Sequence, residues 1–139
     1  ENKTHRYPLT ILEAHLDMLG HVNNASYLTL LEEARWDLMT RNHYGLDKIK
    51  ECGVSPIVLE INIRFHKELL NRTKIVIETH AASGDRKIVL IHQEIKSESG
   101  DTLFATAESR CGLFDLTRRK LVSPTPEWRR VLGYLRNDL

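Results

Sequence analysis

The residues best suited to do chemistry lie together in the segment D-M-L-G-H-V-N-N-A-S-Y, which runs from Asp17 to Tyr27. The segment contains a carboxylate, a glycine, a histidine and two neighbouring amides, and an apolar stripe with helical spacing follows it. The first N–H groups of a helix lack intrahelical acceptors and carry a partial positive charge, so they can stabilise a developing oxyanion. A carboxylate in the preceding loop can act there as a nucleophile or as a base that activates water.

The same residues also allow a purely structural role. Asp17, Asn23 and Asn24 are of types that cap helix N-termini and order turns through local side-chain hydrogen bonds. Gly20 suits a turn in the loop before the helix. From the residues alone, acyl transfer and helix capping therefore remain alternatives.

The motif D-x-x-G-H-V-N-N-x-x-Y, followed by Glu32 and Ala34-Arg35, resembles the 4-hydroxybenzoyl-CoA thioesterase type of hotdog-fold protein. The resemblance extends over nearly the whole chain, because the order of strand, loop, long helix and hairpins also matches. It implies hydrolysis of an acyl thioester carried on coenzyme A or acyl carrier protein, with no cofactor or metal. It also implies a homodimer or homotetramer whose active sites lie at the subunit interface.

Carried over residue by residue, the resemblance implies that Asp17 is the catalytic carboxylate and that the backbone N–H of Asn24 polarises the thioester carbonyl. His21 and Asn23 match the H-V-N-N form found in plant-type acyl-carrier-protein thioesterases, which have an asparagine where this chain has Leu19. His21 is therefore placed with the catalytic residues, tuning Asp17 or donating to the substrate. Ordering of the loop is its structural alternative.

The resemblance also implies a substrate-binding set. Gly20, Asn23 and Tyr27 belong to the motif itself, and the further acidic residue of the family, on the strand after the helix, corresponds to Glu68. The family's Pro and Gly-Asp are absent in that region, where Leu69–Thr73 stands instead. We therefore expect Gly20, Asn23, Tyr27 and Glu68 to contact the substrate.

Other polar residues favour structural roles. Glu32 and Arg35 lie three apart in the expected helix and can form an ion pair. The histidines on expected strands form no HxH or HExxH pattern, so we expect no metal site. The basic run from Arg118 to Lys120 could meet coenzyme A phosphates or an acidic carrier protein, but a solvated turn is the favoured interpretation.

The helices that must position these residues follow from the apolar pattern. A helix of about 20 residues should begin at Asn23 or Asn24 and end near Tyr44-Gly45, because the apolar residues recur at helical spacing. A short helix is expected over Leu46–Cys52, and a terminal helix, with Leu135 in its stripe, should begin after the N-cap Thr125.

Alternation with a period of two predicts the strands. After Pro56, one face of a half-buried strand collects the apolar side chains of Leu59, Ile61, Ile63 and Phe65. The other strands are expected over Tyr7–Glu13, Lys74–Ala82, Lys87–Lys96 and Leu103–Leu116, with Ser-Gly-Asp turns at Ser83–Asp85 and Ser99–Asp101. The prediction is an α+β hotdog fold, in which an antiparallel sheet of about five strands wraps around one long central helix.

Composition limits the organisation and the partners. The 139 residues carry a net charge of +1, and 41% are hydrophobic, so we expect one domain over residues 1–139 and no nucleic-acid binding by general phosphate attraction. No apolar run reaches the length of a membrane span. Cys52 and Cys111 read as buried thiols in a reducing compartment, which favours a cytoplasmic protein. An exposed edge strand should pair with a second copy.

The leading hypothesis is therefore an acyl-CoA or acyl-carrier-protein thioester hydrolase, with its acyl chain in an apolar groove between helix and sheet. One alternative is a hotdog protein that binds acyl-CoA without turning it over, although Asp17 has little use in a pure sensor. The other is an enoyl-thioester hydratase, whose glycine-aspartate-x-asparagine-proline-x-x-histidine signature is not found in the sequence.

Overall fold

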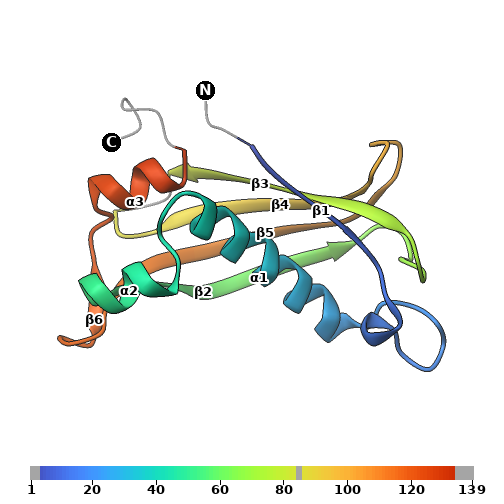
Figure 1. The fold of residues 1–139 in the computed structure, drawn as a ribbon, viewed down its shortest axis with the longest axis horizontal. Coiled ribbons are helices and arrows are strands. Elements are labelled where there is room, and N and C mark those ends of the chain that lie inside the picture. The colour runs from blue at the N-terminus through green and yellow to red at the C-terminus, as the bar shows by residue number, and fades with distance from the viewer. Residues whose placement is uncertain (1–3, 84–85, 134–139) are drawn as a thin grey trace.

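The computed structural model describes residues 4–83 and 86–133. A long helix, α1 (Asn24–Arg41), lies against one face of an antiparallel sheet (Figure 1). The strands follow the order β1-β3-β4-β5-β2, and β6 pairs with β5. Their bounds are β1 His5–Thr10, β2 Val54–Phe65, β3 Lys74–Ser83, β4 Val89–Ser97, β5 Leu103–Asp115 and β6 Lys120–Val122. The predicted hotdog architecture is confirmed, with one short strand more than the sequence indicated.

The start of α1 and its buried face agree with the predictions. The Asn23 side chain accepts a hydrogen bond from the Ser26 N–H at 2.9 Å, so Asn23 is the N-cap. The buried stripe of the helix consists of Tyr27, Leu30, Leu31, Ala34, Leu38 and Met39. This stripe holds α1 against the sheet and thereby fixes the place of its N-terminus.

The end of α1 comes earlier than predicted. His43 adopts a positive φ of 65°, and the Tyr44 N–H returns to the Met39 carbonyl at 2.7 Å. This Schellman arrangement ends the helix at Arg41. The predicted end near Tyr44-Gly45 was wrong because a histidine, rather than the glycine, takes the left-handed position.

The two short helices agree with the sequence. α2 (Leu46–Cys52) ends at Gly53, whose φ of 72° gives it a left-handed cap. α3 (Pro126–Val131) begins at Thr125, whose hydroxyl accepts a hydrogen bond from the Trp128 N–H at 3.1 Å. Leu135, which we expected in the apolar stripe of that helix, lies outside the described residues, as do Gly84 and Asp85 of the first predicted turn.

The first strand ends at Thr10 rather than at Glu13. The chain then turns into a single 3-10 turn, Glu13–His15, in which the Leu12 N–H donates to His15 Nδ1 at 2.9 Å. This local hydrogen bond takes the place of a ladder bond, so the last part of the predicted strand was wrong.

β2 departs most from its predicted burial. Ile61 and Ile63 pack on the core as expected, but Leu59 is 48% exposed and Phe65 is 51% exposed. A bulge after Val58 interrupts the alternation. In addition β2 has a neighbouring strand, β5, on one side only. The prediction of a half-buried strand was therefore wrong for Leu59 and Phe65 within one chain.

The basic run forms a tight turn before β6. The Asp115 carboxylate accepts hydrogen bonds from the N–H groups of Thr117 and Arg118, both at 2.9 Å, and Arg119 has a φ of 60°. The solvated-turn interpretation is confirmed, and these contacts lower the pKa of Asp115. The sequence did not predict β6 because a strand of three residues is too short to show alternation.

The two cysteines differ in exposure, and both are free thiols. Cys111 is buried as expected, whereas Cys52 is exposed, so the expectation of a buried thiol was wrong for Cys52.

In the part of the chain that the structure describes, no helix is long and apolar enough to cross a membrane.

Candidate active site

The loop before α1 is a closed turn organised by the Asp17 carboxylate. Asp17 Oδ1 accepts hydrogen bonds from the Leu19 N–H at 2.9 Å and from the His21 N–H at 3.2 Å. The Asp17 N–H donates to the His21 carbonyl at 2.8 Å, and Gly20 completes the turn with a φ of 80°. Asp17 is exposed, so these contacts hold one carboxylate oxygen and leave the side chain at the surface.

This loop is attached to the segment between β2 and β3. The Val22 N–H donates to the Leu69 carbonyl at 3.0 Å, and His21 forms an isolated bridge with Leu70. As a result His21 Nε2 lies 3.0 Å from Glu68 Oε2. The structure therefore brings together two predicted site residues that are far apart in the sequence.

A cavity of about 280 Å³ opens where the loop meets α1. It is lined by His21, Val22, Asn24, Tyr27 and residues 65–69. Among the described residues, the Asn24 N–H donates to no acceptor, as expected for the first residue of a helix. The cavity is thus lined by the residue whose amide is free, by an imidazole and by a carboxylate.

Tyr27 forms the apolar wall of this cavity. Its ring meets the Phe65 ring edge to face, with centroids 4.9 Å apart. Burial raises the pKa of Tyr27, so the hydroxyl stays protonated at neutral pH. Tyr27 can contact a substrate but is not poised to act as a base.

The other predicted site residues lie beside the cavity rather than in it. Asp17 and Gly20 belong to the adjoining turn, and neither lines the cavity. The side-chain oxygen of Asn23 is used to cap α1. Within one chain the cavity therefore gathers His21, Asn24, Tyr27 and Glu68.

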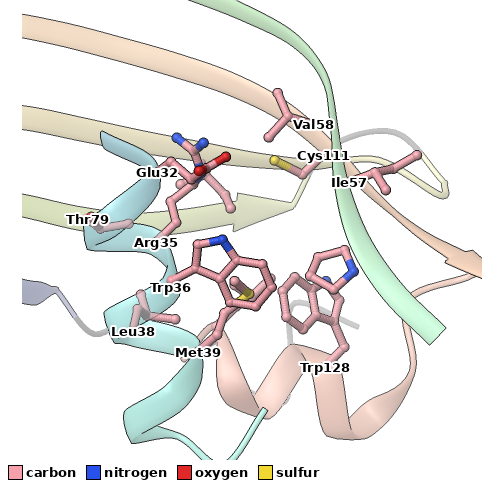
Figure 2. Close-up of a pocket in the computed structure, with 13 residues that line it drawn as sticks. Glu32, Arg35, Trp36, Leu38, Met39, Ile57, Val58, Thr79, Cys111 and Trp128 are labelled. Carbon is pink, nitrogen blue, oxygen red and sulfur yellow. The ribbon is translucent and has the colours of Figure 1, made fainter. Parts of the chain in front are cut away.

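A second cavity, of about 240 Å³, lies further along α1 (Figure 2), and the sequence analysis did not name the residues that line it. Side chains of α1, β2 and α3 line it, including Arg35, Trp36 and Trp128, which Figure 2 shows around one space. Most of its other lining residues are apolar, namely Leu38, Met39, Pro56, Ile57, Val58, Ile91 and Leu132.

Arg35 is held at this second cavity by a buried glutamine. Arg35 Nη1 donates to Gln93 Oε1 at 2.9 Å, and Gln93 Nε2 donates to the Leu31 carbonyl at 3.0 Å and to Thr79 Oγ1 at 3.1 Å. Glu32 and Arg35, which we expected to pair within the helix or across a dimer, form no ion pair among the described residues of one chain, because Arg35 turns toward β4. A polar Gln93 between two apolar inward-facing residues of a strand was the sequence signal for this contact.

Burial also governs the titration of the groups at this cavity. It lowers the pKa of Arg35, while Glu32 and Cys111 act in the opposite direction. It raises the pKa of the Cys111 thiol to about 11, although Arg35 opposes the shift. Cys111 is therefore a protonated, unreactive thiol at neutral pH, and this cavity has the character of a binding site rather than a catalytic one.

The Thioesterase-like superfamily matches residues 12–132 of the sequence. The chain belongs to this superfamily. It is 30% identical over 118 residues to the long-chain acyl-CoA thioesterase FadM of Escherichia coli, covering 85% of this chain and 89% of FadM. The resemblance to thioesterases that the motif suggested is therefore confirmed.

Two further comparisons place the chain within the superfamily. It is 31% identical over 135 residues to an L-carnitine dehydrogenase/betainyl-CoA thioesterase of Agrobacterium fabrum, covering 93% of this chain but 27% of that longer protein. Its fold matches the crystal structure of "YbaW Probable Thioesterase" from Escherichia coli with a TM-score of 0.82 and 26% identity, covering 93% and 96% of the two chains. The named thioesterases among these relatives support thioester hydrolysis as the activity of this superfamily member.

Proposed function

We propose that this chain hydrolyses acyl-CoA thioesters at the N-terminus of α1. The observation that carries the proposal is the cavity that Asn24, whose N–H is free, lines together with the His21–Glu68 pair. A fixed amide donor at a helix N-terminus stabilises the oxyanion that forms when a thioester carbonyl is attacked. Coenzyme A is the expected carrier because FadM and the Agrobacterium fabrum relative are both named as CoA thioesterases.

Asp17, which lies in the turn beside the cavity, supplies the attacking group in one of two ways. Its Oδ1 is held by two backbone N–H groups, whereas Oδ2 accepts no hydrogen bond from the described residues. Oδ2 either attacks the carbonyl carbon, expels the coenzyme A thiolate and leaves an anhydride for water to cleave, or takes a proton from water that attacks directly. Both routes yield a carboxylic acid and free coenzyme A.

A second copy of the chain completes the site. β2 is an edge strand of 12 residues, and Val58, Leu59 and Phe65 on it are between 43% and 51% exposed. Antiparallel pairing of β2 with its copy would satisfy the open edge and cover these side chains. Because Phe65 also lines the cavity, the subunit boundary would pass beside the reaction site. Such a homodimer, alone or paired into a tetramer, would act in the cytoplasm with its thiols reduced.

The test is the hydrolysis of short, medium, long and aromatic acyl-CoAs, with free thiol as the readout. We expect turnover by the parent and a loss of at least about a hundredfold in kcat for Asp17→Asn. Asp47→Asn, which removes an exposed carboxylate in α2, is the matched control and should keep the parental rate. A folded Asp17→Asn protein that is as active as the parent would exclude the assigned role of Asp17.

The same preparations test the assembly. Light scattering on the eluted protein should give the mass of a dimer or a tetramer, and Leu59→Lys on the open edge should shift it toward one chain. A monomeric parent that hydrolyses acyl-CoA would show that one chain forms the whole site.

A further inference from the structure

The flank of α1 that faces β2 carries two charged side chains that lack an ion-pair partner among the described residues. These are Glu32 and Arg35, which line the second cavity together with residues 56–58 of β2. Figure 1 shows the helix crossing in front of this strand. Of the five N–H donors of a guanidinium, Arg35 uses only Nη1, toward Gln93, within the described part of the chain. Most of its donors therefore stay available on this flank.

The opposite flank of α1 differs, because its carboxylates find partners in β1. The Tyr7 hydroxyl donates to Glu33 at 2.5 Å, and His5 Nε2 lies 2.8 Å from Asp37 Oδ2. The first strand therefore closes one side of the helix by polar contacts. The described chain supplies no such contacts to Glu32 on the other side.

Partial burial makes a missing counter-charge costly at Arg35. The side chain is half-buried, and burial lowers its pKa, because a charge that leaves water is destabilised unless an opposite charge lies close to it. Glu32 of the same chain acts on Arg35 only beyond ion-pair distance. A carboxylate from outside the chain would therefore stabilise the guanidinium.

A second copy of the chain would present such a carboxylate. α1 runs antiparallel to β2, because its first turn meets the end of the strand, where the Tyr27 and Phe65 rings are 4.9 Å apart, while residues further along α1 meet residues 56–58. A two-fold axis that pairs β2 antiparallel with its copy therefore also places the two α1 helices antiparallel on one face of the joined sheet.

The positions of Glu32 and Arg35 along the helix suit contact across that axis. In an antiparallel pair, a residue on one side of the axis faces the residue that lies equally far beyond it on the partner. The midpoint between Glu32 and Arg35 lies about one residue from the middle of α1 (Asn24–Arg41). Packed helices are about 8–10 Å apart, which the two long side chains can span.

We propose that α1 packs against α1 of a second copy, with Glu32 of each chain paired to the partner's Arg35. The inference rests on the homodimer of the proposed function and names the residues that select a second copy of this chain as the partner. Each dimer contains two identical ion pairs, in which a planar guanidinium can donate twice to one carboxylate. Leu28, one turn before Glu32 and 43% exposed, is covered by the same contact.

The experiment exchanges the two charges in separate preparations. Glu32→Arg leaves two arginines on the flank and Arg35→Glu leaves two glutamates, so each variant should repel its own copy. The dissociation constant of each homodimer, measured by light scattering on dilution, should rise by at least about tenfold over the parent. A mixture of the two variants restores both attractive contacts, but only in the heterodimer.

The composition of the mixture is the decisive measurement. Native mass spectrometry of an equimolar mixture, with a mass tag on one variant, counts the three kinds of dimer. Random pairing gives about half heterodimer, whereas the reciprocal pairs should give more than about nine-tenths. Contact between Glu32 and Arg35 inside one chain cannot produce this excess, because each variant would then carry its repulsion into every dimer.

The matched control uses two exposed charges with the same spacing in α2. Asp47→Arg and Lys50→Glu change charge as the test variants do and should pair at random when they are mixed. If Arg35→Glu fails to fold, Arg35→Met replaces it. Its heterodimer with Glu32→Arg keeps one attractive contact, whereas the Glu32→Arg homodimer has two repulsive ones, so the heterodimer should still exceed one half.

Random pairing of folded test variants would overturn the inference, and so would a parent that stays monomeric at every concentration. Both readouts are masses, so they are independent of turnover. A parent without thioesterase activity whose variants form the heterodimer would support the paired helices and reject the proposed hydrolysis. An active parent whose variants pair at random would reject the paired helices alone.

Discussion

The two cavities along α1 are built from opposite chemistry. The one at the N-terminus of the helix is open, and its polar groups are a backbone amide and a half-exposed His21–Glu68 pair. The one near Arg35 lies among tryptophans and aliphatic side chains, and its polar groups are donors held inside the protein. One helix therefore carries a polar site at its start and an apolar site further along.

Under the proposed function, this difference separates the reaction from the binding of the ligand. Groups that must meet water and a changing charge stand at the open end, where a helix start provides an unpaired N–H without any side chain. Groups that only hold a ligand can be packed into the core, where each also supports the fold. Substitutions near Asn24 should therefore change the rate, whereas substitutions near Trp128 should change stability first.

The largest expected effect on stability is that of Trp128→Ala. Trp128 is only 1% exposed and contacts the Tyr44 ring with centroids 5.3 Å apart. Its truncation leaves a void beside an existing cavity, so the free energy of unfolding should fall by about 3–5 kcal/mol in urea denaturation followed by circular dichroism. Trp36→Ala, at a half-buried position of the same cavity, is the comparison and should cost less. Equal costs would show that Trp128 is not a core residue.

Asn24→Pro should have the largest effect on the rate. Asn24 is the first residue of α1, and Asn23 before it is already extended, with φ −80° and ψ 162°. Proline is tolerated at this helix position, and an extended residue may precede it, so the fold should be retained. The substitution removes only the N–H assigned to the oxyanion, and kcat should fall by about 10²–10³.

The matched control for this substitution is Asn24→Ala, which removes the side chain and keeps the N–H. It should retain kcat within about threefold, because the proposal gives the side chain no role. A folded Asn24→Pro protein with the kcat of Asn24→Ala would move the oxyanion site away from the helix start.

These two regions also differ in how far the sequence could predict them. The Asp17–Tyr27 motif is contiguous, and its local hydrogen bonds arise within the loop and the first turn of the helix, so the N-cap and the turn could be expected. The resemblance placed both His21 and Glu68 in the site. Their contact could not be predicted from the sequence, because it depends on the bridge between His21 and Leu70.

The sequence predicted an apolar groove between helix and sheet, but it could not identify the residues that line the second cavity, because they come from α1, α3 and four strands. Arg35 was expected to pair with Glu32 because side chains three apart on a helix are neighbours, yet the fold places Gln93 of β4 closer. The exposure of Leu59 and Phe65 also depends on β2 being an edge strand, which the alternation of its residues does not reveal.

A smaller effect should appear at alkaline pH, where Cys111 at the apolar cavity titrates. Burial raises its pKa from 9.0 to about 11. Between these values the unfolded chain loses the thiol proton while the folded chain keeps it, so stability falls with rising pH, by about 1.4 kcal/mol per pH unit at most. Cys111→Ala should flatten this part of the stability profile between pH 9 and pH 11 relative to the parent. Parallel profiles for the two proteins would contradict the burial effect.

The smallest expected effect is the coupling between His21 and Glu68 at the open cavity. Their side chains are 41% and 59% exposed, so solvent screens the 3.0 Å contact. A double-mutant cycle with His21→Ala and Glu68→Ala, measured by urea denaturation, should give less than about 1 kcal/mol of coupling in stability. The same cycle in kcat/KM should give a larger coupling if both side chains contact the substrate, because a bound ligand excludes the water that screens them. A rate coupling no larger than the stability coupling would reduce the pair to a surface contact, and the reaction would then rest on Asp17 and the Asn24 amide alone.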